Sequence, residues 1–378
     1  MKNKRMYFVV VLMLAASFVL SGVGVAAAKE GGEDHSIGAV YTLTNSAAGN
    51  EVLIFNRTVN GTLTAAGSVS TGGLGTDAGL GSQGALTLSA NYRWLFAVNA
   101  GSNDLSVFAV TPHGLILVDK VASGGVMPIS VTNYRDIVYV LNAGGSGNIT
   151  GFTLSRRGKL TPIDNSTRNL SNNGNGAAPG PAQISFSPDG QALVVTEKAT
   201  NLIDTFPVDE DGVAGDLTTH PSAGVTPFGF TFARHGTLVV SEAAGGAVNA
   251  SSASSYDVSA DSFDVISAAV PTQQTAACWA VATKNGWYAY TANAGSGSIS
   301  LYAVSRDGGL TLRNSAAGST GATSHPSDMA LGRYGHFLYV LANATQSIGV
   351  FEVRFDGSLV AVNGTSGLPA TAVGLAAW

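Results

Sequence analysis

The chain of 378 residues has little charge and almost no cysteine. Asp, Glu, Lys and Arg make up 11% of it, against roughly 25% in ordinary soluble domains, whereas 45% of the residues are hydrophobic. This balance excludes a charge-rich disordered chain. No block of Lys or Arg follows the first five residues, and the net charge is −5. Because binding to a nucleic-acid backbone needs a basic stripe, we expect no nucleic-acid partner.

Cys278 is the only cysteine, so the chain cannot form an intramolecular disulfide and must rely on a packed core. A small buried apolar residue is a simpler interpretation of this thiol than a nucleophile. The HExxH and CxxC motifs are also absent. The glycine-rich residues 72–75 open no helix, which excludes the usual phosphate-binding loop. We therefore expect no organic cofactor.

The first 28 residues have the features of a secretory signal peptide. Three basic residues among the first five precede an apolar stretch to about Val25, and three alanines follow. A charged start, an apolar middle and small residues at the cleavage site define such signals. An uncleaved membrane anchor is the alternative, because the stretch is long. We expect cleavage after Ala28 and a secreted or periplasmic monomer, with one domain over residues 29–378.

A repeat of about fifty residues organises the rest of the chain. Each copy centres on an aromatic and aliphatic strand, clearest at residues 94–102, 137–145, 287–296 and 337–344, with weaker copies at 40–45, 193–197 and 238–242. A run of residues with period-two alternation, such as Ile348–Val353, follows this central strand, and most of these runs lead to a Gly turn and a further short strand. A strand that begins with Pro, such as Pro181–Ser187, precedes the central strand. Such alternation, closed by Asp-Gly or Asn-Gly, is typical of hairpins, so each repeat predicts four strands.

Seven four-stranded units predict an all-β fold, a seven-bladed β-propeller with four antiparallel strands per blade. The chain starts at the second strand of a unit, Val40–Asn45, and residues 372–377 have the pattern of the missing first strand. We therefore expect the C-terminal strand to close the ring. A flat sandwich is one alternative. An open stack of repeats is another, but it would need capping units that this sequence lacks.

The repeated "YVxN" strand, "ISVFxV" strand and "DGxL" turn resemble those of lactonase-type seven-bladed propellers, the 6-phosphogluconolactonase and carboxymuconate-cyclase-like proteins. The resemblance covers essentially all of the chain after the signal peptide. Residues 81–86, 277–279 and 374–377 look like an exported branch of that family. The other propeller repeat with a "YVTN" strand usually lacks the DGxL turn. The resemblance implies hydrolysis of a lactone ring.

The resemblance carries over to only part of the family's site. In the phosphogluconolactonases the innermost strand of the fourth blade begins with Pro-Arg-His, and a Glu closes the strand after it. Pro181 and Glu197 match this pattern, whereas Ala182 and Gln183 stand where Arg and His would be. Both this departure and export speak against a phosphorylated sugar lactone as the substrate.

The alternation of side chains along the strands predicts a polar funnel at one end of the central channel. On the innermost strands, large apolar residues alternate with residues that face the channel. At the entry end the latter are Gln183, Gly229, Trp279 and Asp328. The second strands end on the same face with Asn45, Asn99, Asn142, Glu197, Glu242, Asn293 and Asn343.

Glu197 and Glu242 are the catalytic candidates of this funnel. Paired carboxylates can activate water as a general base or hold a divalent cation such as Ca²⁺ or Mg²⁺, and the spacing does not decide between these roles. The Asn residues also suit tight turns, which is their simpler interpretation. The residues expected to bind a lactone or carbohydrate-like ligand are Gln183, Trp279, Asp328, Asn142 and Asn293.

Two functions stay open. The first is hydrolysis of a lactone or related cyclic ester at the funnel, with Glu197 as general base. The second is a non-catalytic extracellular or surface binding protein that keeps the lactonase scaffold without the Arg-His pair, because a fold does not determine a function. Residues 161–181 are expected to form a long loop on the funnel face, either a lid or a mobile segment.

Overall fold

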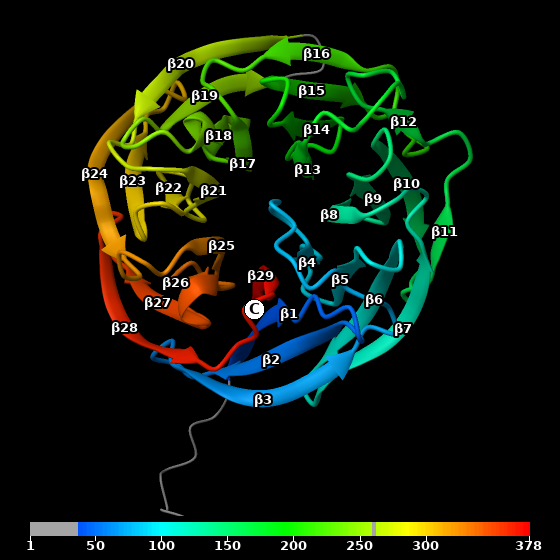
Figure 1. Cartoon of the computed structure of the whole chain (residues 1–378), viewed down its shortest axis with the longest axis horizontal. Helices are drawn as coiled ribbons and strands as arrows, with labels where there is room; N and C mark the ends of the chain where they lie inside the picture. Colours follow the sequence, from blue (N-terminus) through cyan, green and yellow to red (C-terminus); the bar gives the residue numbers. More distant parts are fainter. Residues whose placement is uncertain (1–36, 259–261) are drawn as a thin grey trace, which may run out of the picture. The chain divides into compact units, whose positions relative to one another are not determined.

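The computed structural model describes residues 37–258 and 262–378, so the predicted signal peptide lies outside the described residues. Seven antiparallel sheets form a ring around a central axis (Figure 1). Six sheets have four strands, and the third has a fifth, short strand. The prediction of a seven-bladed propeller is confirmed. No helix among the described residues has the length and apolar character needed to cross a membrane.

The strands follow one another from the centre of each blade to its rim. Blade 1 has β29 (Val373–Ala377), β1 (Gly38–Leu43), β2 (Glu51–Arg57) and β3 (Leu63–Ser70). Blade 2 has β4 (Leu86–Leu88), β5 (Trp94–Asn99), β6 (Asp104–Thr111) and β7 (Gly114–Ala122). Blade 3 has β8 (Pro128–Tyr134), β9 (Ile137–Asn142), β10 (Asn148–Leu154), β11 (Leu160–Pro162) and β12 (Arg168–Asn169).

The remaining blades have four strands each. Blade 4 has β13 (Pro181–Phe186), β14 (Ala192–Glu197), β15 (Leu202–Pro207) and β16 (Thr218–Pro221). Blade 5 has β17 (Pro227–Phe232), β18 (Leu238–Glu242), β19 (Ser252–Val258) and β20 (Phe263–Pro271). Blade 6 has β21 (Ala277–Ala282), β22 (Tyr288–Asn293), β23 (Ser298–Val304) and β24 (Leu310–Ser319). Blade 7 has β25 (Pro326–Leu331), β26 (Phe337–Ala342), β27 (Ser347–Val353) and β28 (Leu359–Ser366). Three short 3₁₀ turns are η1 (Arg234–Gly236), η2 (Ala244–Gly246) and η3 (Asn343–Thr345).

The C-terminal strand closes the ring, as predicted. β29 pairs antiparallel with β1, with Val40 opposite Ala377. Beyond the strand, the Trp378 N–H donates to the Ala39 carbonyl at 2.8 Å, and Arg57 Nε donates to the Trp378 carbonyl at 3.1 Å. The first blade is therefore assembled from both ends of the propeller.

The second strands are buried on both sides, because neighbouring blades cover their two faces. In β9, residues 138–141 have no exposed surface. A strand with one exposed face would alternate apolar and polar residues, so burial on both faces explains why this strand is a continuous apolar run. The hydroxyl group of the tyrosine in this strand finds its hydrogen-bond acceptor in the next blade. Tyr139 donates its hydroxyl to the Gly212 carbonyl at 2.8 Å, and Tyr290 donates to the Gly357 carbonyl at 2.7 Å. The "YVxN" strand and the "DGxL" turn thus recur together because they contact each other between blades.

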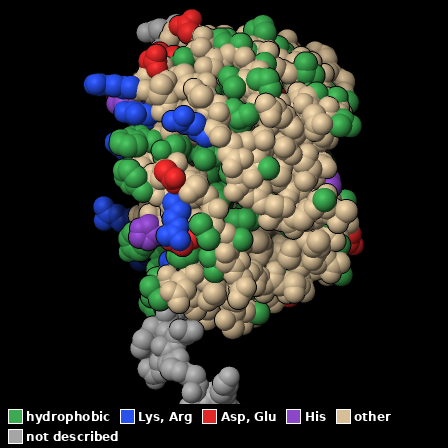
Figure 2. All heavy atoms as spheres, turned by 90° about the vertical axis from the view of Figure 1, so that its left-hand side faces the viewer, with side chains coloured by type: hydrophobic (Ala, Val, Ile, Leu, Met, Phe, Trp, Pro, Cys, Tyr) green, Lys and Arg blue, Asp and Glu red, His purple; other side chains and the backbone are tan. Residues whose placement is uncertain are grey.

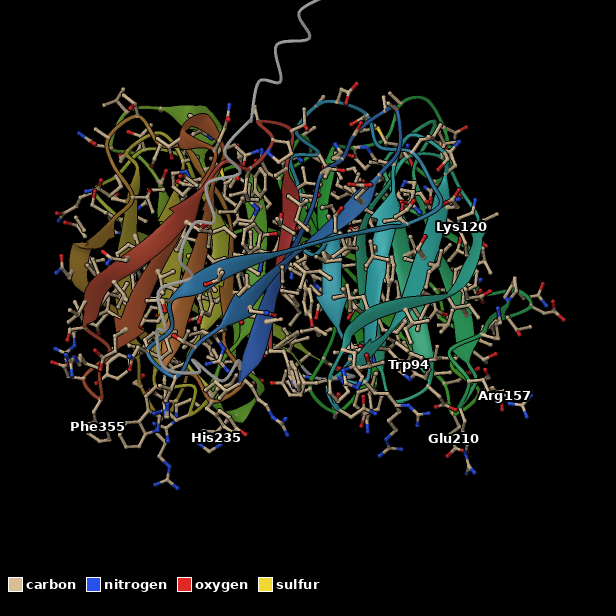
Figure 3. The ribbon with its side chains drawn as sticks, turned by 90° about the horizontal axis from the view of Figure 1, so that it is seen from below. Trp94, Lys120, Arg157, Glu210, His235 and Phe355 are labelled. Carbon is tan, nitrogen blue, oxygen red and sulfur yellow. The ribbon has the colours of Figure 1, made fainter. Side chains whose placement is uncertain are left out.

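The two faces of the ring differ sharply in charge. We call the side with the loops that enter first strands and leave second strands the entry face, and the other side the turn face. The entry-face loops hold three residues of the types Asp, Glu, Lys, Arg and His: Asp77, Lys198 and His325. The described hairpin turns of the turn face hold ten Lys or Arg and eight Asp or Glu. Figure 2 shows Lys and Arg side chains gathered toward one face, and Figure 3 shows Arg157, Glu210, His235 and Phe355 projecting on the turn face.

Candidate functional site

Polar side chains on the innermost strands tie several blades to the next blade of the ring. In blade 2, Thr87 Oγ1 donates to the Val131 carbonyl of blade 3 at 3.0 Å. In blade 4, the side-chain amide of Gln183 pairs with the backbone of Phe230 in blade 5, accepting from its N–H at 2.7 Å and donating to its carbonyl at 3.1 Å. Gln183 therefore faces the channel, as predicted, but its hydrogen bonds are partly used within the fold.

Blade 5 lacks such a side chain, because Gly229 stands where Gln183 stands in blade 4. Gln83, from the loop before β4, takes its place. Its amide donates to the Ala280 carbonyl at 2.8 Å and accepts from the Ala280 N–H at 3.0 Å. A Cβ atom on Gly229 would lie 2.1 Å from Gln83 Oε1 and 2.7 Å from the Cys278 carbonyl oxygen, so only glycine leaves room here.

Residues 79–84, which we call the plug, cross the entry end of the channel. Figure 1 shows the segment before β4 reaching into the centre of the ring. Besides Gln83, the plug is held by Lys198 Nζ, which donates to the Gly81 carbonyl at 2.5 Å, and by Trp279 Nε1, which donates to the Ser82 carbonyl at 3.0 Å. The expected open funnel on the entry face is therefore divided by a segment of the chain itself.

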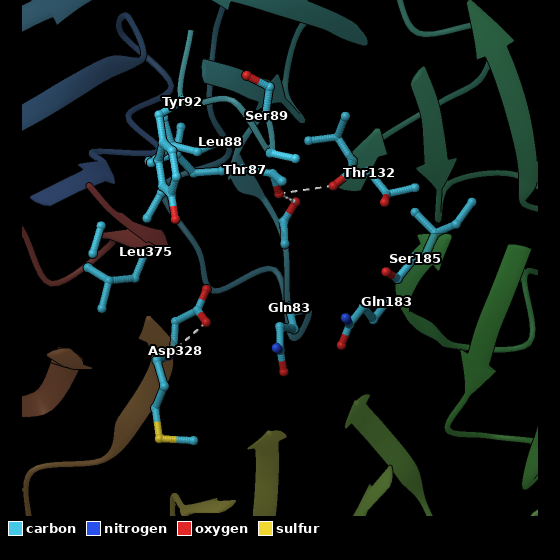
Figure 4. A pocket seen from close by; sticks show the side chains of 18 of the residues that line it. Gln83, Thr87, Leu88, Ser89, Tyr92, Thr132, Gln183, Ser185, Asp328 and Leu375 are labelled. Carbon is cyan, nitrogen blue, oxygen red and sulfur yellow. Dashed lines mark hydrogen bonds between the residues drawn. The ribbon is translucent and has the colours of Figure 1, made fainter. Parts of the chain in front are cut away.

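Below the plug lies a polar cavity of about 330 Å³, which we call the channel cavity. Figure 4 shows Gln83, Thr87, Thr132, Gln183, Ser185 and Asp328 around it. The cavity extends to the turn face, where Tyr92 and Lys284 line it. Its size is within the range of small-molecule sites. The ligand path that the structure offers to this cavity therefore starts on the turn face.

Asp328 is the titratable group at the inner end of the channel cavity. The Met329 N–H donates to its Oδ1 at 2.7 Å, and the Leu375 N–H also donates to the carboxylate. Burial outweighs these bonds and raises the pKa of Asp328 to about 8. A carboxyl group that titrates near neutral pH inside a cavity is suited to accept or donate a proton.

Glu197 lies outside the channel cavity, at the end of β14 and without exposed surface. Its oxygens accept hydrogen bonds from Ser171 Oγ at 2.5 Å, the Ser171 N–H at 3.1 Å and Thr200 Oγ1 at 2.6 Å. The carboxyl of Asp204, on β15, lies against it. The structure thus fastens Glu197 to the loop before β13. Its predicted catalytic role stays a prediction.

Glu242 occupies the same position in blade 5 and is equally buried. Ser252 Oγ donates to one carboxylate oxygen, and Ser254 Oγ donates to the other at 2.5 Å. Burial raises the pKa of Glu242, and the serine hydroxyls act in the opposite direction. Neither Glu197 nor Glu242 lines the channel cavity, and the catalytic role predicted for Glu242 also stays a prediction.

Two asparagines of the predicted ring bond to the third strand as Glu242 does, but they donate where Glu242 accepts. In blade 6, Asn293 Nδ2 donates to Ser298 Oγ at 3.0 Å and to Ser300 Oγ at 2.9 Å. In blade 3, Asn142 Nδ2 donates to Asn148 Oδ1 at 2.7 Å. Both residues join the second strand to the third, and neither lines the channel cavity. Their predicted part in ligand binding stays a prediction.

Trp279 lies on the other side of the plug from Asp328. It lines a separate, mainly apolar pocket of about 370 Å³ on the entry face, together with Leu80, His325 and Val373. Its ring packs against Phe228 at a centroid distance of 5.2 Å. The sequence-predicted ligand residues are therefore split, with Gln183 and Asp328 below the plug and Trp279 above it.

Two further polar groups border the plug. Lys198 lies 4.7 Å from the centre of the Phe228 ring, and burial lowers its pKa to about 8. Cys278 is buried, and burial raises the pKa of its thiol to about 12. This thiol is in the unreactive form at neutral pH, which agrees with its interpretation as a small core residue. Within the described residues, no three His, Cys, Asp or Glu side chains gather as a metal site requires.

Sequence reasoning missed Gln83 and Asp204. Gln83 lies in a loop, where strand alternation gives no direction for a side chain. The signal available in the sequence was Gly229. A glycine at this position leaves blade 5 without a side chain to bond blade 6, so another segment must supply one. Asp204 lies on a third strand, for which the alternation of the innermost strands makes no prediction.

The fold and the channel cavity define a seven-bladed propeller with a central cavity that is closed at one end. Residues 40–171 and 245–370, more than half of the chain, match the family model described as "Lactonase, 7-bladed beta-propeller". The chain belongs to this family. The interval between the matched segments, residues 172–244, contains Gln183, Glu197 and Glu242.

Solved structures share the fold at low sequence identity. A periplasmic gluconolactonase from Pseudomonas aeruginosa is 14% identical with a TM-score of 0.68, covering 89% of this chain and 98% of its own. A candidate 6-phosphogluconolactonase from Bacteroides fragilis is 18% identical with a TM-score of 0.67, over 92% and 99%. A protein from Lactobacillus plantarum is 17% identical with a TM-score of 0.69, over 90% and 99%. A search of curated proteins gave no match.

Proposed function

We propose that this protein hydrolyses a lactone or related cyclic ester in the channel cavity. Membership of the lactonase family supports the reaction class, and a gluconolactonase with the same fold supports a sugar-derived lactone. The single observation that carries the proposal is Asp328, a buried carboxyl group with a pKa of about 8 at the inner end of a polar cavity. Its ionised form is a base of suitable strength near neutral pH.

In this proposal Asp328 acts on water. The Asp328 carboxylate removes a proton from a water molecule as the water oxygen bonds to the lactone carbonyl carbon. The ring C–O bond then breaks, and the proton passes from Asp328 to the released ring oxygen, which gives an open-chain hydroxy acid. Gln83 and Gln183 each have a second amide hydrogen beyond the one bonded to the neighbouring blade, and these hydrogens suit the carbonyl oxygen.

Glu197 and Glu242 keep the fold in place in this proposal. The support is their complete burial and the hydroxyl groups that already bond their oxygens. The test is a panel of lactones, beginning with glucono-δ-lactone, on wild type, Asp328→Asn and the matched control Glu242→Gln. Loss of a general base costs about 10²–10⁴-fold, so we expect this loss in Asp328→Asn alone. Wild-type hydrolysis should rise with pH toward about 8 and then level off.

Equal rates in wild type and Asp328→Asn on every lactone would refute this assignment. The alternative function is ligand binding without turnover. It is favoured by Gln183, which stands where the resembling enzymes have His and is bonded to Phe230 through both amide atoms. Lactones that raise the melting temperature without being hydrolysed would support this alternative.

Export is part of the same proposal. The apolar stretch and the alanines at 26–28 support it, and the Pseudomonas relative is described as periplasmic. Mass spectrometry of the secreted protein should find Lys29 as its first residue. An intact Met1 in secreted material would contradict cleavage.

A further inference from the structure

The end of the second strand is joined to the third residue of the next strand in several blades. Asn99 Nδ2 donates to Ser106 Oγ at 2.8 Å in blade 2, and Asn293 Nδ2 donates to Ser300 Oγ at 2.9 Å in blade 6. In blade 5 a carboxylate occupies the first position and accepts from a serine at the second. Every one of these pairs contains a hydroxyl group, which can donate or accept.

Blade 4 departs from this rule, because both positions are acids. Glu197 ends β14, and Asp204 is the third residue of β15; we call them the acid pair. Neither has exposed surface. Among the described residues, no N–H or O–H group donates to either Asp204 oxygen, whereas three donors from Ser171 and Thr200 bond the Glu197 carboxylate.

A buried pair of carboxylates cannot carry two charges without a compensating cation. Glu197 already accepts three hydrogen bonds, whereas no group of the described residues donates to Asp204, so Asp204 is the residue that we expect to carry the proton. A protonated Asp204 has an O–H group that can donate to Glu197, which supplies the hydroxyl that serine supplies in blades 2, 5 and 6.

We propose that Glu197 and Asp204 share one proton and that this proton holds the loop at residues 170–180 on blade 4. The proposal is independent of any lactone chemistry. Burial first, and Glu197 second, raise the pKa of Asp204 to about 9, in agreement with the geometry.

The loop is attached to the end of β14 at both of its ends. At its start, Ser171 donates twice to Glu197. At its end, the N–H groups of Lys198 and Ala199 donate to the carbonyls of Gly180 and Pro179 at 2.9 Å and 3.1 Å. Loss of the shared proton places a second negative charge beside Glu197, so the strand end that fastens the loop is destabilised.

Few ionisable groups surround the acid pair. The rim strand presents Thr219 opposite Asp204, and residues 170–180 contain no Asp, Glu, Lys, Arg or His. Among the described residues, Glu197 is the one group whose charge acts on Asp204. His220, beside Thr219, bonds Thr205 Oγ1 at 2.9 Å, and burial lowers the pKa of this imidazole. Lys198 follows Glu197 and points to the plug.

The direction of the pH dependence follows from the raised pKa. The folded protein keeps the Asp204 proton to higher pH than the unfolded chain does, so its contribution to stability is complete below about pH 4 and is lost as the pH rises to about 9. One such proton changes the unfolding equilibrium constant about tenfold for each pH unit in this interval.

The experiment compares wild type with Asp204→Asn by hydrogen exchange and mass spectrometry at pH 7 and pH 10. Rates are divided by the intrinsic rate at each pH, and a peptide covering residues 293–300 of blade 6 is the internal control. The asparagine amide can donate to Glu197 without titrating, as Asn99 Nδ2 does to Asp104 Oδ1 at 2.5 Å in blade 2.

We expect protection of residues 170–180 in wild type to fall about tenfold or more at pH 10 relative to the control peptide, and to stay constant in Asp204→Asn. The same fall in both proteins would overturn the proposal, as would no fall in wild type. If Asp204→Asn does not fold, Asp204→Ser replaces it, since blades 2, 5 and 6 have serine at this position.

A second measurement separates a proton from a metal ion. Melting temperatures of wild type and Asp204→Asn are measured at pH 9 in CaCl₂ and in EDTA. We expect calcium to leave both unchanged. If calcium raises the melting temperature of wild type alone, the acid pair binds a metal cation and the shared-proton assignment is wrong.

Discussion

The entry face and the turn face differ in where their charged side chains lie. On the entry face, the plug and loops with few charged residues close the channel, and the nearby carboxylates of Glu197, Glu242 and Asp328 are buried. On the turn face, charged side chains project into solvent around the open end of the channel cavity (Figure 3). The comparison indicates that the few buried carboxylates near the entry face affect stability and chemistry more than the many exposed charges of the turn face.

The physical cause lies in hydration. A surface Arg or Asp keeps its water shell, so its contribution to stability is small. A buried carboxylate loses that shell and must receive hydrogen bonds in return, which Ser252 and Ser254 provide for Glu242. Changes at the entry face should therefore cost stability, whereas changes at the turn face should not.

The largest effect should come from the strand that lies between the two faces. Deleting residues 369–378 removes β29, exposes the inner side of β1 and opens the ring. Because the whole inner strand and the closure are lost, we expect no cooperative unfolding transition. Calorimetry of the truncated chain is the measurement, and a transition at the wild-type temperature would contradict the closure.

The next largest effect should be at Glu242. Glu242→Ala leaves two buried serine hydroxyls without their acceptor, and an unsatisfied buried polar group costs about 1–3 kcal/mol. We expect a loss of about 2–4 kcal/mol in the free energy of unfolding. Urea denaturation measures it.

The matched control is Glu210→Ala, an exposed acid of the turn face, which should change this free energy by less than about 0.5 kcal/mol. Similar losses for the two variants would show that the faces do not differ in this way.

The fold could be predicted because its repeated residues contact one another. Tyr139 bonds the Gly212 turn of the next blade, so the strand motif and the turn motif must recur at a fixed spacing. The ring closure followed from where the repeats begin and end. The strand alternation also placed Gln183 and Asp328 correctly at the channel.

The candidate site was less predictable, because alternation gives the side of a strand but not the partners found there. The end of β18 was correctly placed on the entry face, yet whether Glu242 is free depends on Ser252 and Ser254 in the following strand. The serines at alternate positions were a readable signal. The plug was not readable from any strand pattern, because Gln83 bonds a residue 197 positions away in the sequence.

A smaller effect should follow from opening the plug. Gln83→Ala removes the two hydrogen bonds to the Ala280 backbone, each worth about 0.5–1.5 kcal/mol net, so we expect a loss of about 1–2 kcal/mol. Gln191→Ala on the turn face is the control, since this side chain is exposed.

Opening of the entry end has its own measurement. Hydrogen exchange of a peptide covering residues 277–282 should accelerate in Gln83→Ala, because the Ala280 N–H loses its acceptor. Unchanged exchange there would mean that the plug does not seal the channel.

The smallest effect should be at a surface ion pair of the turn face. Arg354 Nη1 lies 3.0 Å from Glu352 Oε1, and their side chains are 52% and 36% exposed. Such pairs contribute little to the free energy of unfolding, because water screens the charges and two long side chains lose conformational freedom. We expect Arg354→Ala to change the free energy of unfolding by about 0.5 kcal/mol or less, and the double variant with Glu352→Ala to give a coupling energy of similar size. A loss of about 2 kcal/mol in the free energy of unfolding would equal the loss expected for a buried carboxylate, and the two faces would then not differ in how much their charged residues stabilise the fold.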